Sequence, residues 1–222
     1  MAQIFHRGAN TIAKASIVAA VLLGGIAFYV VTQIARSSYL TGIDVDRQQP
    51  VQFSHKHHSG DDGIDCRYCH TAVETSSSAG MPPTQTCMNC HSQIWSDSPY
   101  LEIVRASYRD NKPIQWEKVH DLPDYVYFNH SAHINKGVGC STCHGNVAEM
   151  PAIHQVNTLQ MEWCLACHRE PEKFLRPKSE IYNTYWRPQN ATSEEYEQGK
   201  ALKAEYKVRN RQMMTSCSTC HR

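Results

Sequence analysis

All ten cysteines of this 222-residue chain fall into five pairs with identical spacing. Two residues separate the cysteines of each pair, and a histidine follows the second cysteine directly. Only 13 residues of the chain are histidine, so a histidine after all five pairs would arise by chance on the order of once in a million. The motifs, numbered one to five in chain order, are Cys66-Cys69-His70, Cys87-Cys90-His91, Cys140-Cys143-His144, Cys164-Cys167-His168 and Cys217-Cys220-His221.

The Cys-x-x-Cys-His motif is the attachment signature of c-type haem. Its two thiols can form thioether bonds to the haem vinyl groups, and its histidine can bind the iron as the proximal ligand. Zinc knuckles are an alternative, but five pairs cannot be shared two by two, and zinc does not require the histidine. Disulfides would not require it either, and a thioredoxin-like motif would accompany a βαβ pattern, which is not visible here. We therefore expect five covalent haems.

Residues 15–34 form an uncharged apolar run near the N-terminus. Twenty helical residues at about 1.5 Å each reach roughly 30 Å, which matches the hydrocarbon core of a bilayer. A cleaved signal peptide is the alternative, but a cut after Ala35 would leave Gln33 where small residues are preferred. We predict a transmembrane helix over residues 15–36, preceded by a leader over residues 1–14.

The charges around this run predict its orientation. Arg7 and Lys14 precede it without any acid, whereas Asp44 and Asp46 follow it. Because positive charge is retained on the cytoplasmic side, we expect the N-terminus inside and everything after about residue 37 outside. The net charge of +1 gives no indication of nucleic-acid binding.

Two stretches of the sequence nearly repeat each other. Residues 53–70 read FSHKHHSGDDGIDCRYCH, and residues 128–144 read FNHSAHINKGVGCSTCH. The repeat predicts two haem modules. Module one, residues 37–97, holds motifs one and two, and module two, residues 128–222, holds motifs three to five with an insertion over residues 170–216.

Residues 98–127 connect the modules and begin with a predicted helix, residues 98–109, whose apolar face carries Leu101, Val104 and Tyr108. A second helix is predicted at 192–214, capped by Thr192 or Ser193. Strand patterns are scarce, and five haems in so short a chain must supply much of its apolar interior. The predicted fold class is a mainly helical and irregular, haem-cored multihaem cytochrome c with little regular strand and one N-terminal transmembrane helix.

Each iron has a second, distal axial position, and the remaining histidines are candidates for it. His6 lies on the cytoplasmic side of the predicted membrane helix. The other candidates are His55, His57, His58, His120, His130, His133 and His154. Met81, Met150 and Met161 could supply thioether ligands, which would raise a haem potential, but packing is their more ordinary role.

The order Phe-x-His-x-x-His before a Cys-x-x-Cys-His resembles the modules of class III cytochromes, of the c3 and c7 type. In that family the first histidine binds the haem that follows it, and the second binds a haem further along. The resemblance implies these distal ligands for haems one to five, in order: His55, His58, His130, His133 and His154. His57 and His120 are alternates, and His120 is the one that could replace His58 at haem two.

Two protein ligands on every iron would leave no open position for a substrate. A multihaem reductase needs at least one haem with an open position, and such enzymes sometimes replace a motif histidine, whereas all five motifs here keep theirs. The pattern favours electron transfer over catalysis, and we expect no catalytic residue in this chain.

A narrower resemblance extends over nearly the whole chain. It rests on the blocks QPVQFSHKHHSGDDGIDCRYCH, MPPTQTCMNCHSQIW and VHDLPDYVYFNHSAHINKGVGCSTCHG, together with the apolar run and the five motifs. These are similar to the pentahaem cytochrome subunit of bacterial alternative complex III. A related hexahaem subunit occurs in quinone reductase complexes of sulfate reducers, from which this chain differs in having five motifs.

This resemblance implies membership of a quinol-oxidising membrane complex. Electrons would pass from the iron–sulfur clusters of a large subunit, through these haems, to a monohaem cytochrome or another periplasmic acceptor. Polytopic partner subunits would bind the quinol. The chain would be a single-pass protein of the bacterial cytoplasmic membrane with a periplasmic haem domain. A stand-alone, membrane-anchored multihaem quinol dehydrogenase is the alternative.

Overall fold

The computed structural model describes residues 4–186 and 193–221 of the chain. The chain divides into two compact units, Met1–Ile43 and Asp44–Arg222. The first unit is an extended helical segment, and the second contains all five motifs. Each unit has its own architecture.

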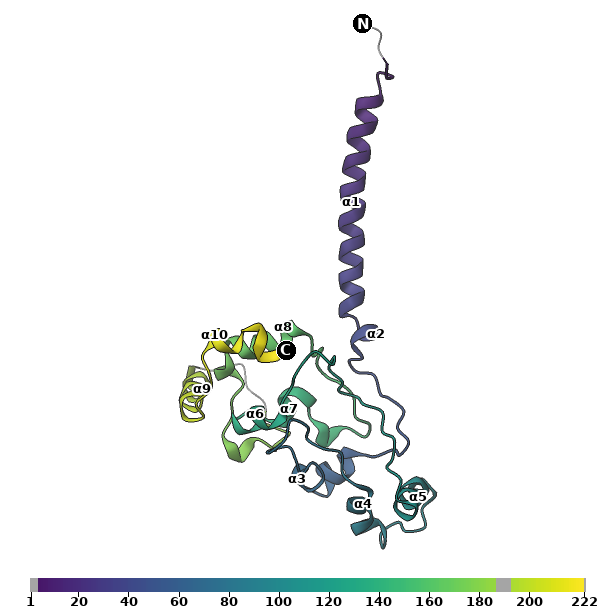
Figure 1. Cartoon of the computed structure of the whole chain (residues 1–222), viewed down its shortest axis with the longest axis vertical. Helices are drawn as coiled ribbons and strands as arrows, with labels where there is room; N and C mark the ends of the chain where they lie inside the picture. The colour runs from purple at the N-terminus through teal and green to yellow at the C-terminus, as the bar shows by residue number, and fades with distance from the viewer. Residues whose placement is uncertain (1–3, 187–192, 222) are drawn as a thin grey trace. The chain divides into compact units, whose positions relative to one another are not determined.

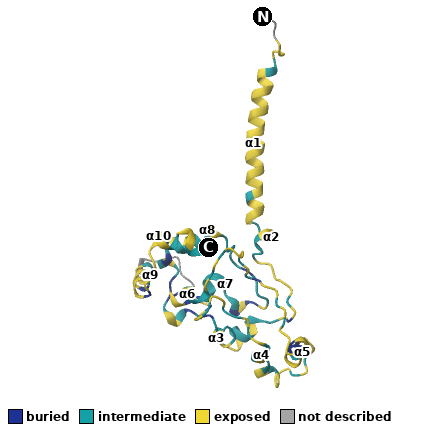
Figure 2. Cartoon of the chain, viewed as in Figure 1, coloured by how far each residue is buried: buried dark blue, intermediate teal, exposed yellow. Residues whose placement is uncertain are grey.

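Helix α1 (Ala9–Arg36) of the first unit is long and apolar enough to cross a membrane, and none of its residues is buried within the chain (Figures 1 and 2). It begins at Ala9 rather than at residue 15, because residues 9–14 contain no glycine or proline. A fully exposed apolar helix of this length suggests membrane anchoring. The short helix α2 (Ser38–Thr41) follows and ends at Gly42, whose φ of 70° is left-handed.

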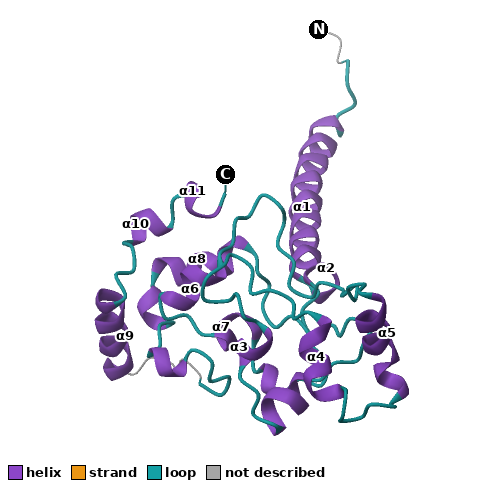
Figure 3. Cartoon of the chain, turned by 60° about the horizontal axis from the view of Figure 1, so that its bottom comes forward, coloured by secondary structure: helices purple, strands orange, loops and turns teal. Residues whose placement is uncertain are grey.

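The second unit is built from short helices joined by long loops, as Figure 3 shows. Its α-helices are α3 (Cys66–Cys69), α4 (Thr84–His91), α5 (Glu102–Asp110), α6 (His130–Asn135), α7 (Cys140–His144), α8 (Met161–Arg169), α9 (Ser193–Glu205), α10 (Arg211–Met214) and α11 (Cys217–Cys220). A π-helix spans Lys56–Asp61. The described residues form no β-strand, only isolated bridges such as that between Val126 and His221. The predicted fold class is confirmed.

Every Cys-x-x-Cys-His motif lies on a short helix. Motifs two, three and four lie wholly within α4, α7 and α8, while α3 and α11 end at the last cysteine of motifs one and five. Asp65 caps α3 by accepting a hydrogen bond from the backbone N–H of Arg67 at 2.8 Å. Helices this short are not stable alone, so packing around each motif must hold them.

Helix α5 occupies most of the range predicted for the connecting helix. A 3-10 turn at Pro99–Leu101 precedes it, since proline is compatible with a helix start but not with its interior. The helix ends at Asn111, which has a left-handed φ of 51°. Asparagine tolerates this conformation better than most residues.

The buried face of α5 differs from the predicted face at one position. Leu101 and Val104 are buried, but Tyr108 is 48% exposed, and Ser107 is buried instead. The Ser107 hydroxyl lies 2.7 Å from the hydroxyl of Thr84 on α4. A polar residue occupies the inward position because a hydrogen bond satisfies it there.

The predicted C-terminal helix is two helices. Helix α9 ends before Lys207, whose φ of 50° is left-handed, and α10 begins at Arg211. The break follows from Tyr206, which is buried in a cluster with Leu202 and Val138, so the chain must turn there. Of the two predicted caps, Thr192 lies outside the described residues.

Within the described residues, buried hydrophobic side chains form three separate clusters rather than one core. The clusters are Val138, Leu175, Leu202 and Tyr206; Val51, Leu101 and Val104; and Val73, Ile134 and Ile181. Much of the second unit is exposed or only partly buried (Figure 2). Groups of three or four side chains bury too little area to stabilise a unit of this size. The polypeptide alone therefore lacks a continuous interior.

Candidate haem-binding site

The ten motif cysteines are free thiols. Burial raises the pKa of Cys143 to about 11 and that of Cys167 to about 12. A cysteine outside a disulfide is available for a thioether bond. The sulfur atoms therefore fit covalent haem attachment.

The motif histidines are held through one ring nitrogen, Nδ1. In four motifs Nδ1 bonds to a backbone carbonyl: His70 to Gly80 at 2.8 Å, His91 to Ile94 at 3.0 Å, His168 to Met214 at 2.9 Å and His221 to Tyr125 at 3.2 Å. Because a carbonyl only accepts, Nδ1 carries the proton and Nε2 keeps its lone pair for a metal. Burial lowers the pKa of His144, the fifth, to about 3, which keeps its ring neutral.

The histidines implied as distal ligands are oriented in the same way. Nδ1 bonds to a carbonyl in His58 (Ser54, 2.9 Å), His130 (Ser77, 2.9 Å) and His133 (Asn129, 2.7 Å). Burial lowers the pKa of His55 to about 4, and its buried Nδ1 has no hydrogen-bond partner in the described part of the chain. Neutral imidazoles with a free Nε2 are the form that binds iron.

In three pairs of these rings, the ring centres lie as far apart as those of two imidazoles that share one iron. The ring centres are 6.2 Å apart for His58 and His91, 6.4 Å for His130 and His144, and 6.2 Å for His133 and His168. A metal–imidazole bond is about 2 Å long and the ring centre lies roughly 1 Å beyond, so rings that share one iron are about 6 Å apart. These are the ligand pairs implied for haems two, three and four.

The pairs that the resemblance implies for haem one (His55 and His70) and haem five (His154 and His221) do not show this ring spacing. His55 lies close enough to His70 that, after burial, His70 is the largest influence lowering the pKa of His55. His154 bonds instead to the Asp46 carboxylate at 3.2 Å. No ring contact joins His154 to His221 among the residues that the structure describes.

The two alternative distal ligands, His57 and His120, lie in different surroundings. His57 is exposed, and its ring nitrogens face Asp61 at 3.8 Å and Asp62 at 3.6 Å. His120 has a buried Nε2 without a partner in the described residues, and its ring lies 4.3 Å from that of His144. The structure thus places His120 beside motif three rather than motif two.

The three methionines considered as thioether ligands also differ. Met150 is buried, and its side chain packs closely on the backbone at Gly145. Met81 and Met161 are more than half exposed. Met150 therefore has a packing role, and Met81 and Met161 lie at the surface.

The phenylalanines of the repeated pattern orient the histidine pairs, a role that spacing alone does not reveal. Phe53 stacks on His58 with ring centres 4.4 Å apart and meets His55 edge-on at 4.9 Å. Phe128 makes the same contacts with its own pair, stacked at 4.5 Å and edge-on at 4.7 Å. One aromatic ring thereby packs on two imidazoles, which the class III resemblance assigns to different motifs.

Comparisons with known proteins agree with this arrangement. Residues 126–222 match the family described as Cytochrome c7 and related cytochrome c, and residues 32–120 match the Class III cytochrome C family. The menaquinone reductase multiheme cytochrome c subunit of Nitratidesulfovibrio vulgaris is 33% identical over 143 residues, which cover 55% of this chain and 68% of that protein. The chain belongs to the multihaem cytochrome c family. As a member, this cytochrome carries c-type haem and transfers electrons.

The influence of one thiol on the pKa of another indicates which motifs of the cytochrome are neighbours. After burial, Cys87 is the largest influence raising the pKa of Cys69, so motifs one and two adjoin. A hydrogen bond between the thiols of Cys66 and Cys140 lowers the pKa of Cys66 to about 7, so motifs one and three adjoin. Motif one therefore lies between motifs two and three.

The same kind of influence indicates the neighbours of the remaining motifs. After burial, Cys164 raises the pKa of Cys143, and Cys220 raises that of Cys164. Motif four therefore adjoins motifs three and five. The spatial order of the motifs is two, one, three, four, five, and motifs two and five lie at its ends.

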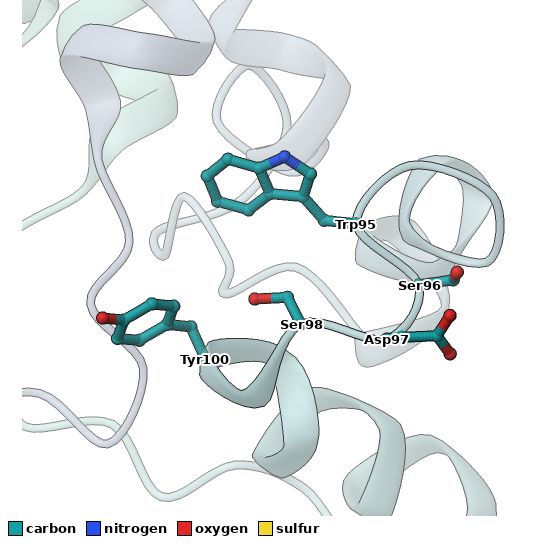
Figure 4. Close-up of a pocket in the computed structure, with 5 residues that line it drawn as sticks. All are labelled: Trp95, Ser96, Asp97, Ser98 and Tyr100. Atoms are coloured by element: carbon teal, nitrogen blue, oxygen red, sulfur yellow. The ribbon is translucent and has the colours of Figure 1, made fainter.

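An open pocket of about 430 Å³ lies just after motif two and is lined by Trp95, Ser96, Asp97, Ser98 and Tyr100. Figure 4 shows the rings of Trp95 and Tyr100 extending from this one loop. Trp95 is 65% exposed and has a left-handed φ of 56°. Among the described residues, no histidine or cysteine lines the pocket, so it is separate from the haem-binding residues.

Proposed function

We propose that this cytochrome binds five c-type haems and relays electrons as the pentahaem subunit of a quinol-oxidising membrane complex of the alternative complex III type. Electrons would reach it from a large iron–sulfur subunit, and it would deliver them to a monohaem cytochrome or another periplasmic acceptor. The quinol site would belong to polytopic partner subunits. Helix α1 would anchor the chain with its N-terminus inside and the haem domain on the periplasmic side.

The observation that carries this proposal is the pairing of imidazoles about 6 Å apart at motifs two, three and four. Bound haem would supply a one-electron carrier at each motif. At these three motifs, histidines on both faces would leave no position for a substrate, which favours transfer over catalysis. The unbroken spatial order gives every motif a neighbour to exchange electrons with.

The haem count and ligation can be tested on the purified protein. Alkaline pyridine spectroscopy should give five covalent haems per chain, and electron paramagnetic resonance of the oxidised protein should show low-spin signals. A high-spin ferric signal would reveal an open iron and favour a reductase instead.

The assignment to a complex can be tested by purification from the native membrane in mild detergent. We expect the cytochrome to elute with polytopic subunits and a large iron–sulfur subunit. A solitary subunit whose haems are reduced directly by quinol would contradict the proposal and favour the stand-alone quinol dehydrogenase.

A second candidate follows from the relative in Nitratidesulfovibrio vulgaris, which is a subunit of a menaquinone reductase. In that role electrons would leave through a quinone rather than arrive from a quinol. The purified complex distinguishes the two directions. Oxidation of menaquinol with reduction of a periplasmic acceptor supports the first candidate, and net reduction of menaquinone by a periplasmic donor supports the second.

A further inference from the structure

We propose that the buried guanidinium of Arg176 raises the reduction potential of the haem at motif three, so that an electron is held preferentially at the middle of the motif order. The inference rests on a haem bound at motif three. It does not depend on which membrane complex contains the cytochrome.

Arg176 is the largest side chain that is fully buried in the described residues, with 0% exposure. Its Nη2 donates hydrogen bonds to the hydroxyls of Thr142 at 2.8 Å and Ser141 at 3.2 Å. These are the two residues between the cysteines of motif three. The cation is therefore fixed against the helical turn that carries the thioether bonds.

The backbone of motif three is shaped to admit this side chain. A Cβ added at Gly139, directly before the first cysteine, would lie 2.2 Å from the Arg176 Cζ. The backbone N–H of Arg176 also donates to the carbonyl of Gly137 at 3.0 Å. The glycine allows a close approach that any other residue would prevent.

The groups that contact the guanidinium directly are neutral. Nη1 donates to the backbone carbonyls of Glu180 and Asn183, each at 3.2 Å, and the charge lies 4.2 Å from the centre of the Trp186 ring. Nε is buried and has no hydrogen-bond partner among the described residues. No carboxylate forms an ion pair with Arg176 in the described chain, and the Glu180 side chain accepts from Asn183 at 2.7 Å instead. The positive charge is therefore not neutralised by direct contact.

Motif one provides a contrast, since it contains an arginine that is neutralised. Arg67 lies between the cysteines of motif one and pairs with Asp65 at 2.9 Å on a half-exposed surface. Its charge is compensated and screened by solvent. Of these two arginines, the one at motif three combines full burial with neutral partners.

A buried, unpaired cation favours the reduced form of a nearby haem, because reduction removes one positive charge from the iron site. Burial lowers the pKa of Arg176 to about 10, which leaves it charged at neutral pH. With an effective dielectric constant of about 20, a unit charge about 10 Å from a redox centre would change the ratio of its reduced to its oxidised form on the order of tenfold. Arg176 is thus a residue that tunes a potential rather than an iron ligand.

Redox titration of the full-length cytochrome in detergent tests this inference. Arg176→Gln and Arg176→Met remove the charge in two different ways, and Arg176→Lys retains it. We expect both neutral variants to shift one step to lower potential by about tenfold in the redox ratio, or 59 mV for one electron, while the lysine variant shifts much less. A His130→Met variant, altered opposite His144, identifies the step that belongs to motif three.

Haem content is measured first in every variant. Neutral variants with a full haem content and unshifted steps would overturn the proposal, as would a lysine variant that shifts as far as the neutral ones. If both neutral variants lose haem, the lysine variant decides. If the motif-three step of Arg176→Lys is unshifted, the role of charge is supported. If that step shifts about tenfold in the redox ratio, the proposal is overturned.

Discussion

The two modules hold their histidine pairs with the same aromatic contacts but on different helices. In module one the pair lies at the start of the π-helix Lys56–Asp61, whereas in module two it lies on α6. Phe53 and Phe128 nevertheless stack on the second histidine at 4.4 and 4.5 Å. The modules therefore preserve the position of the rings rather than the type of backbone.

One additional residue explains the difference. Seven residues separate His58 from Cys66 in module one, and six separate His133 from Cys140 in module two. A π-helix accommodates one extra residue in a helical turn, and the N–H of Asp62 indeed donates to the carbonyl five residues earlier at 3.0 Å. The comparison teaches that the pattern tolerates an insertion after the second histidine as long as the stacked ring stays in place.

The largest effect should come from removing a whole motif. Replacing both cysteines of motif three, Cys140 and Cys143, by alanine should lose one haem and much of the cooperative unfolding, since motif three joins motif one to motif four. The same change at Cys87 and Cys90 should lose one haem with a smaller loss of stability, because motif two lies at an end. Haem content and thermal unfolding measure both. Equal loss of stability would contradict the spatial order.

Exchange of the second histidine tests whether the modules are equivalent. His58→Met and His133→Met should each raise the potential of one step, because a thioether ligand favours the reduced iron. His57→Met is the matched control, since His57 faces two carboxylates at the surface. Redox titration and the visible spectrum measure the change. If a variant left every potential and the spectrum unaltered, its histidine would not be a ligand.

The π-helix can be tested through its contact with module two. A Cβ at Gly60 would lie 2.2 Å from the carbonyl oxygen of Ala148, so Gly60→Ala should lower the free energy of unfolding by about 2 kcal/mol. Gly63→Ala is the control, because Gly63 has a φ of 68° but open space around it. It should cost about 1 kcal/mol from conformation alone. Equal losses in chemical denaturation would exclude a steric contact.

The smallest effect concerns an ion pair in the insertion of module two. Lys203 donates to Glu172 at 2.9 Å, and the Glu172 side chain is only 12% exposed. Burial acts to raise the pKa of Glu172, but hydrogen bonds led by that from Lys203 outweigh it and lower the pKa below its usual value. The pair should therefore contribute about 1 kcal/mol above the carboxyl range and lose it as pH falls through the lowered pKa.

Glu172→Gln should accordingly lower the melting temperature at neutral pH, and the difference from the parent should shrink in acid. Glu170→Gln is the control, because Glu170 pairs with Lys173 on an exposed surface and such pairs contribute little. A difference between Glu172→Gln and the parent that persisted unchanged below about pH 4 would show that charge is not responsible.

The sequence predicts the features of this cytochrome that depend on local chemistry. The motif spacing places Cys66, Cys69 and their counterparts on short helical turns, and the apolar run predicts helix α1. Even the inward positions of Leu101 and Val104 follow from helical spacing. These features need no knowledge of distant contacts.

Features that depend on distant contacts could not be predicted. The break at Lys207 requires Tyr206 to pack on Val138, and the inward Ser107 requires the Thr84 hydroxyl. The unpaired cation of Arg176 carries no local signal, since only the folded chain brings it to motif three. Spatial neighbours, unlike spacing, are a property of the tertiary structure.

The three separate clusters of buried side chains bear on how the cytochrome is made. A polypeptide without a continuous interior cannot become compact before its prosthetic groups are attached, so maturation and folding become one event. We expect a chain that fails to receive its cofactors to stay open and to be degraded rather than stored. The cell would then regulate the abundance of this protein through its supply of haem.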